Sequence, residues 1–174
     1  MRPAVGRSGE LWWSVAANGE TGIREMASFY GTETYAVDHK GRLSVPAAMR
    51  RDTSRKKSLV AFHLVAGFEG CLALYSSDDW KRVEDRLRRI PMGDRRGRAF
   101  ARAFLMDACK VTVDAQGRIT IPPALMHRAE IGKEAVLHGQ VDRIEIWNPE
   151  RLKSVVHEAS GQLESLADEV LGRE

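Results

Sequence analysis

An internal repeat constrains the fold of this chain more than any other feature of its sequence. Residues 37–49 read VDHKGRLSVPAAM, and residues 113–125, which begin 76 positions later, read VDAQGRITIPPAL. The similarity returns at an offset of 72, where residues 72–78 align with residues 144–150. A repeated supersecondary unit can bury the apolar face of each copy against its neighbour. The repeat therefore predicts two copies of one unit that share a core.

Each copy is predicted to run in the order strand, turn, strand, short helix, strand, strand, helix. Ser76 and Asn148 occupy aligned positions and are candidates to cap the last helix of each copy. A unit of about 70 residues is marginal alone, because it buries only roughly 60% of its unfolded surface. We therefore expect a mixed, β-rich α+β fold in which the two copies are β-hairpin/helix units that form a pseudo-dimer within one chain.

The repeat also sets the expected boundaries along the chain. Residues 1–25 hold four glycines and show no helical or strand period, and Met26 is an alternative start three residues before Phe29. The expected order is a flexible N-terminal extension (1–28), a first unit (29–90), a basic linker with the start of a helix (91–103), a second unit (104–160) and an acidic C-terminal tail (161–174).

The last helix of each copy carries apolar residues at helical spacing, which predicts one buried face per helix. In the second helix, Gly161 is expected to interrupt the regular structure. The residues predicted to be buried are Trp80, Val83, Leu87 and Ile90 in the first helix, and Leu152, Val156, Ala159, Leu163, Leu166 and Val170 in the second.

The turn at the start of each repeat carries the most informative chemistry. In the first copy, Asp38 is expected to accept hydrogen bonds from backbone amides of the turn. Gly41 can adopt a positive φ at no steric cost, because glycine has no Cβ. Arg42 follows at the start of the next strand, where the carboxylate four residues earlier can hold its guanidinium in place. Asp114 and Arg118 repeat this arrangement in the second copy.

A guanidinium that is held in place forms a rigid fork of hydrogen-bond donors. Such a fork matches a phosphate, or the O6/N7 edge of guanine, with two parallel hydrogen bonds. The alternative interpretation is that aspartate and arginine form a structural ion pair that only fixes the turn. Retention of the whole turn in both copies favours a binding function.

The charge of the chain is unevenly distributed. Residues 82–102 contain eight arginines against three acids, whereas residues 158–174 contain five acids and one base. The basic run fits contacts to phosphates, which position a protein without reading sequence. The alternative is a solvated helix face, in which Arg82 and Arg86 pair with acidic neighbours of the same helix.

The doubled Asp-x-x-Gly-Arg-(Ile/Leu)-x-(Ile/Val)-Pro motif resembles that of the MraZ family, whose chains contain two SpoVT/AbrB-like units. The resemblance covers about residues 29–159, and Phe29-Tyr30-Gly31 falls where the family normally starts. It implies a sequence-specific, DNA-binding transcriptional regulator of the division and cell-wall gene cluster. It also implies a cytoplasmic protein on the nucleoid that assembles into rings on repeated promoter boxes.

The resemblance and the turn chemistry together predict a set of DNA-binding residues. His39 and Gln116 lie in the same turns but rank lower, because they differ between the copies. The predicted DNA-binding residues are Arg42, Arg118, Asp38, Asp114, Lys40, Gly41 and Gly117.

Several other classes of protein do not fit the sequence. No stretch reaches the roughly 18 apolar residues that a membrane-spanning helix needs. The two cysteines, Cys71 and Cys109, show no metal-ligand spacing and are expected to be core residues, and no catalytic constellation or phosphate loop is present. We therefore expect no enzymatic activity, metal, cofactor, small-molecule substrate or membrane partner. The alternatives are an AbrB-type antitoxin, which the acidic C-terminus favours slightly, and a scaffold that binds only protein.

Overall fold

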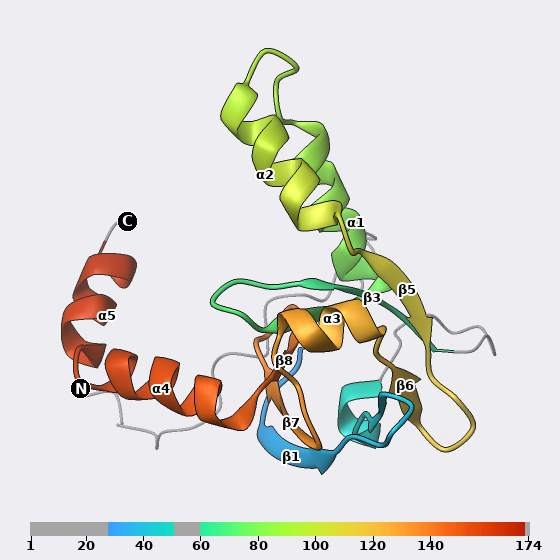
Figure 1. The fold of residues 1–174 in the computed structure, drawn as a ribbon. Coiled ribbons are helices and arrows are strands. Elements are labelled where there is room, and N and C mark those ends of the chain that lie inside the picture. Colours follow the sequence, from blue (N-terminus) through green and yellow to red (C-terminus); the bar gives the residue numbers. More distant parts are fainter. Residues whose placement is uncertain (1–27, 51–59, 173–174) are drawn as a thin grey trace, which may run out of the picture.

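The computed structural model describes residues 28–50 and 60–172, and the elements follow the order that the repeat predicts. The predicted N-terminal extension lies outside the described residues except for Ser28. The elements are β1 (Thr32–Ala36), β2 (Arg42–Ser44), η1 (Ala47–Arg50), β3 (Ala61–Ala66), β4 (Leu72–Ser76), α1 (Ser77–Arg88), α2 (Arg95–Leu105), β5 (Cys109–Thr112), β6 (Arg118–Thr120), α3 (Pro123–Arg128), β7 (Glu134–Gly139), β8 (Ile144–Trp147), α4 (Pro149–Ser160) and α5 (Leu163–Leu171) (Figure 1).

The strands form two antiparallel sheets that draw on both copies of the repeat. The larger sheet has six strands in the order β1-β7-β8-β4-β3-β5, and the smaller pairs β2 with β6. The exchange is reciprocal, because β1 of the first copy pairs with β7 of the second, and β5 of the second pairs with β3 of the first. The two copies therefore cannot be separated without breaking both sheets.

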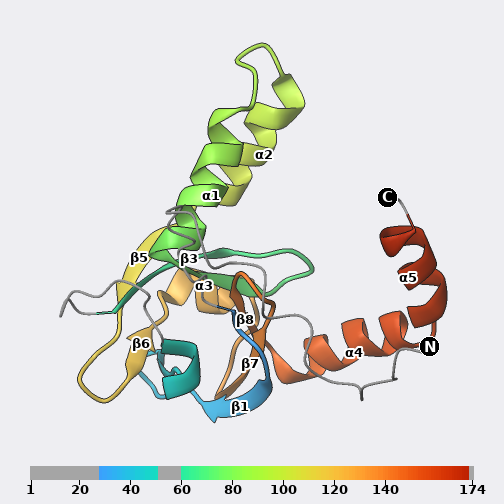
Figure 2. The same cartoon turned by 180° about the vertical axis from the view of Figure 1, so that it is seen from behind.

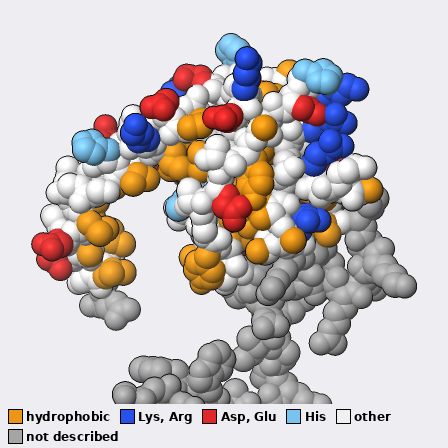
Figure 3. Space-filling view, turned by 90° about the horizontal axis from the view of Figure 1, so that it is seen from below, with side chains coloured by type: hydrophobic (Ala, Val, Ile, Leu, Met, Phe, Trp, Pro, Cys, Tyr) orange, Lys and Arg blue, Asp and Glu red, His pale blue; other side chains and the backbone are white. Residues whose placement is uncertain are grey.

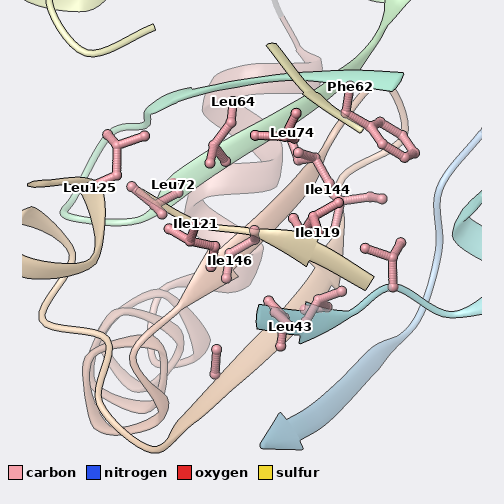
Figure 4. Close-up of a cluster of buried hydrophobic side chains, with 14 of the residues drawn as sticks. Leu43, Phe62, Leu64, Leu72, Leu74, Ile119, Ile121, Leu125, Ile144 and Ile146 are labelled. Carbon is pink, nitrogen blue, oxygen red and sulfur yellow. The ribbon is translucent and has the colours of Figure 1, made fainter. Parts of the chain in front are cut away.

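The pair β2–β6, which we call the ribbon, packs its apolar face on the six-stranded sheet. Leu43 and Ile119 lie opposite each other in the ribbon, and both are fully buried. They contribute to one core with branched aliphatic residues of the large sheet, including Leu64, Leu74 and Ile146 (Figure 4). Alternation along the ribbon then leaves its other face toward solvent.

Each Asp-x-x-Gly-Arg turn is predicted to join the two strands of a hairpin. The structure shows hairpin pairing only at the turn itself. A single bridge joins Val37 to Leu43, and beyond it β1 and β2 belong to different sheets. The reason is that β1 finds its partner in β7, while β2 turns its apolar side toward the core beside β6.

Helices α1 and α2 form a helical hairpin that projects from the body (Figures 1 and 2). Ser76 caps α1 by accepting a hydrogen bond from the backbone N–H of Asp79. Trp80 is buried at the base of the hairpin, where it stacks on His63 of β3 with ring centroids 5.0 Å apart. Val83 packs on the same cluster, whereas Leu87 and Ile90 are only half-buried, so the expected apolar face is buried at the base of the hairpin alone.

Helices α4 and α5 form a second projection, which we call the arm, and here the sequence-based expectation is wrong. Asn148 caps α4, and Leu152 packs beside Trp147, but the helix then leaves the body. Leu163 is 67% exposed and Val170 is 68% exposed, although their spacing predicts burial. The pattern identifies an apolar face correctly, but none of residues 28–50 and 60–172 covers it. The break at Gly161, which separates α4 from α5, is as predicted.

Candidate nucleic-acid interface

The first turn is held by one carboxylate. Oδ1 of Asp38 accepts hydrogen bonds from the backbone N–H of Lys40 at 2.9 Å and of Arg42 at 3.0 Å. Its Oδ2 accepts a hydrogen bond from Nε of Arg42 at 2.6 Å. Gly41 completes the turn with a φ of 73°. The carboxylate thus fixes both the backbone of the turn and the direction of the guanidinium.

The second turn repeats this geometry closely. Oδ1 of Asp114 accepts hydrogen bonds from the backbone N–H groups of Gln116 and Arg118, each at 2.9 Å. Nε of Arg118 donates to Oδ2 of Asp114 at 2.9 Å, and Nη2 lies 2.8 Å from the same oxygen. Gly117 has a φ of 80°. Both turns are therefore built as their sequences predict.

These hydrogen bonds stabilise the ionised carboxylates. The backbone N–H of Arg42, followed by its side chain, lowers the pKa of Asp38 to about 2. The backbone N–H and side chain of Arg118 likewise lower the pKa of Asp114. Because both pKa values lie below the ordinary range, the bracing is present at neutral pH. It is lost only as the pH falls through the folded-state pKa, which for Asp38 is about 2.

The two braced arginines project from one face of the ribbon. The register places Arg42 opposite Thr120 and Ser44 opposite Arg118, so these four residues share a face that is opposite to Leu43 and Ile119. The side chains of Arg42 and Arg118 are 32% and 28% exposed. As diagonal neighbours, their Cα atoms lie about 7–8 Å apart. Both arginines are therefore partly exposed and lie on the same face of the ribbon.

Each turn is fixed to the strand of the other copy. The backbone N–H of Val45 donates to the carbonyl of Gly117, and that of Ile121 donates to the carbonyl of Gly41, both at 2.9 Å. The turns consequently sit at opposite ends of the ribbon, with the two arginines between them. Seen from below, basic side chains gather at the side of the body away from the arm (Figure 3).

A hollow of about 610 Å³ opens beside the first turn. Its lining includes His39 and Lys40 of the turn, together with Lys133, which the sequence analysis missed because it lies far along the chain. The hollow brings Lys133 beside the first turn. The predicted contact made by Lys40 remains a prediction.

The arginine-rich run does not join this surface. It forms the α1–α2 hairpin, which projects from the body on the side away from β1 and η1 (Figures 1 and 2). Part of its charge is used within the helices, since Arg82 pairs with Asp79 and Arg88 pairs with Glu84. The hairpin and the ribbon are therefore separate surfaces of the protein (Figures 1 and 2).

Over residues 28–50 and 60–172, no group of three or more His, Cys, Asp or Glu residues is placed to hold a metal ion. None of the helices in that part of the chain is both long and apolar enough to cross a membrane.

Comparison with known proteins places the two repeat copies in one family. Residues 28–103 and 104–173 each match the family described as "MraZ protein, putative antitoxin-like". The chain belongs to the MraZ family, as the doubled motif predicts. It is 40% identical over 123 residues to the "Transcriptional regulator MraZ" of Alkaliphilus metalliredigens, an alignment that covers 71% of this chain and 82% of that one. It is 36% identical over 143 residues to the protein of the same name from Heliobacterium modesticaldum. This second alignment covers 82% of this chain and 96% of that one.

Proposed function

We propose that this protein is a transcriptional regulator that binds double-stranded DNA through the outer face of the β2–β6 ribbon. The observation that carries the proposal is the pair of braced guanidinium groups on one exposed face. The names of the relatives support the regulatory role. The family resemblance further supports a target in the promoter of the division and cell-wall gene cluster, and a location on the nucleoid.

The shape of the ribbon suits the major groove. That groove admits a two-stranded β-ribbon, and arginine recognises the O6/N7 edge of guanine there. Ser44 and Thr120 lie between and beside the two arginines and add hydroxyl groups to the same face. A separation of about 7–8 Å between the arginine Cα atoms corresponds to roughly two base pairs. One chain would thus cover only a short box.

We also propose that the two copies are AbrB-like units related as the subunits of a dimer. The reciprocal pairing of β1 with β7 and of β5 with β3 supports this, because an approximate two-fold axis between β4 and β8 would produce such pairing. A two-fold axis through the ribbon would present the two arginines to the two strands of DNA alike.

One chain on a single short box would bind weakly. We therefore propose that several chains assemble on DNA that carries repeated boxes. The arm offers an uncovered apolar face that includes Leu163, Leu166 and Val170. It also belongs to the acidic end of the chain, whereas the α1–α2 hairpin is basic. Contact between the arm of one copy and the hairpin of the next would be head-to-tail, and a head-to-tail contact generates a ring when its rotation closes.

The boxes are first located by footprinting the wild-type protein on the DNA upstream of its own gene. The assembly is then tested by comparing DNA that carries one of these boxes with DNA that carries several. We expect the wild type to bind the multi-box DNA at least about a hundredfold more tightly, because linked sites raise avidity by that order. The variant Leu163→Gln/Val170→Gln should have a lower mass in solution and should lose this preference. The exposed substitution Lys153→Gln on α4 is the matched control. Equal affinity of the wild type for both DNAs would contradict the proposal.

An AbrB-type antitoxin is the second candidate function. The acidic, apolar arm favours it, because such a surface can bind a basic partner protein, and the family description includes the term antitoxin-like. Stoichiometric co-purification of a toxin from the native host would favour this candidate.

A further inference from the structure

The two turns of the interface differ in what covers their glycines. The 76-residue offset that aligns the turns also aligns Arg50, at the end of η1, with Met126 in α3. A Cβ placed on Gly41 would lie 2.9 Å from Sδ of Met126. A Cβ placed on Gly117 would lie 2.9 Å from both Cζ and Nη1 of Arg50, and 3.1 Å from Nη2. Each glycine is thus covered by a side chain from the opposite copy.

The three nearly equal distances define how Arg50 lies. They place the flat face of its guanidinium against the Cα of Gly117, one residue before Arg118. A stacked guanidinium keeps its N–H donors pointing outward along its edges. A first-copy residue therefore adds a second guanidinium to the second turn.

This extra charge compensates for a difference between the turns themselves. The first turn carries Lys40, and the aligned position in the second turn is the neutral Gln116. With Arg50 included, the second turn also presents a cation besides its own arginine. In the second turn that cation comes from the other copy.

Among residues 28–50 and 60–172, the charge of Arg50 has no acidic partner. Its Nε is buried without a hydrogen-bond partner, and no acidic residue in the described part of the chain forms an ion pair with it. An arginine with only a packing role could be replaced by methionine, as the aligned position demonstrates. Retention of an unpaired charge beside the interface points to an anionic ligand.

We propose that Arg50 contacts a DNA phosphate beside the second turn, and this inference rests on the proposed DNA-binding function. Arg50 would act as a point of non-specific attraction, whereas Arg118 reads bases. The interface of one chain is then chemically unequal at its two ends, with lysine at one and a stacked arginine at the other.

The test compares Arg50→Met with the wild type in full-length protein, by affinity for the footprinted DNA at several salt concentrations. Methionine reproduces the residue that covers Gly41, so the packing is retained and only the charge is lost. We expect roughly tenfold weaker binding, as for loss of one charge-assisted contact. The slope of log affinity against log salt concentration should fall by about one per chain. The melting temperature should change little.

Two further variants keep the inference falsifiable if Arg50→Met folds poorly. Arg50→Lys should retain the salt slope, and Met126→Arg should steepen it by adding an extra cation to the first turn. Unchanged affinity and slope in Arg50→Met would overturn the inference, as would a Met126→Arg variant that binds with the wild-type slope. If the wild type itself binds no DNA, the proposed function fails, and that outcome is distinct from failure of Arg50 alone.

Discussion

Replacement of both braced arginines, as Arg42→Ala with Arg118→Ala, is expected to reduce affinity for the specific DNA by at least about thirtyfold. Each arginine that reads a base contributes about 1–3 kcal/mol of discrimination, and one chain would lose two. The melting temperature should change little, because ion pairs between half-exposed groups contribute little to stability. Electrophoretic mobility shift and thermal melting of the same preparations give both quantities.

The matched control for this variant removes the same charge elsewhere. Arg86→Ala with Arg95→Ala lies in the α1–α2 hairpin, away from the ribbon, and should reduce specific binding less than about threefold (Figure 1). If the Arg42→Ala/Arg118→Ala variant unfolds, the ion pairs of these arginines with Asp38 and Asp114 are structural. If it binds DNA normally, the ribbon is not the interface.

The substitution Gly41→Val should damage folding as well as binding. Valine resists a positive φ, and Gly41 has a φ of 73°. Its Cβ would lie 2.7 Å from the carbonyl oxygen of Ile121, a backbone atom that is held in the ribbon. We expect a loss of roughly 2–4 kcal/mol in the free energy of unfolding. The corresponding fall in melting temperature is about 5–15 °C for a chain of this size.

Gly93→Val is the control for that substitution. Gly93 lies in the loop between α1 and α2, its φ is not positive, and no atom lies within 4 Å of where its Cβ would be. Its variant should melt close to the wild type and bind normally. A Gly41→Val protein of wild-type stability would show that the turn has a different conformation from the one described.

The turns could be predicted from the sequence because their interactions are local. Asp38 and Arg42 are four residues apart, and the hydrogen bonds that join them lie within one turn of the chain. Aspartate, glycine and arginine at this spacing have few ways to satisfy the backbone of a tight turn. The second copy then follows by repetition, with Asp114 in the place of Asp38.

The strand partners could not be predicted in the same way. Alternation identifies an apolar side of β2, but it does not say whether that strand pairs with β1 or with β6. The outcome depends on contacts between residues far apart in sequence, such as Leu43 with Ile119. Helical spacing has the same limit, because Leu163 and Val170 mark an apolar face without indicating what covers it.

Arg50 illustrates a signal that was present in the sequence but uninformative alone. The alignment of Arg50 with Met126 can be read from the repeat, and two residues of similar length at one position suggest ordinary packing. Only the exchange of strands brings Arg50 over Gly117 of the other copy and gives its charge a place in the interface.

Photo-crosslinking from the ribbon tests the central claim most directly. A photoreactive p-benzoylphenylalanine is placed at Thr120, which is exposed and lies opposite Arg42, and in a second protein at Arg86 on the α1–α2 hairpin. Both proteins are irradiated on the footprinted DNA. The account predicts crosslinks within the protected boxes from position 120 and none within them from position 86. Crosslinks from position 86 alone would place the DNA on the hairpin and contradict the account.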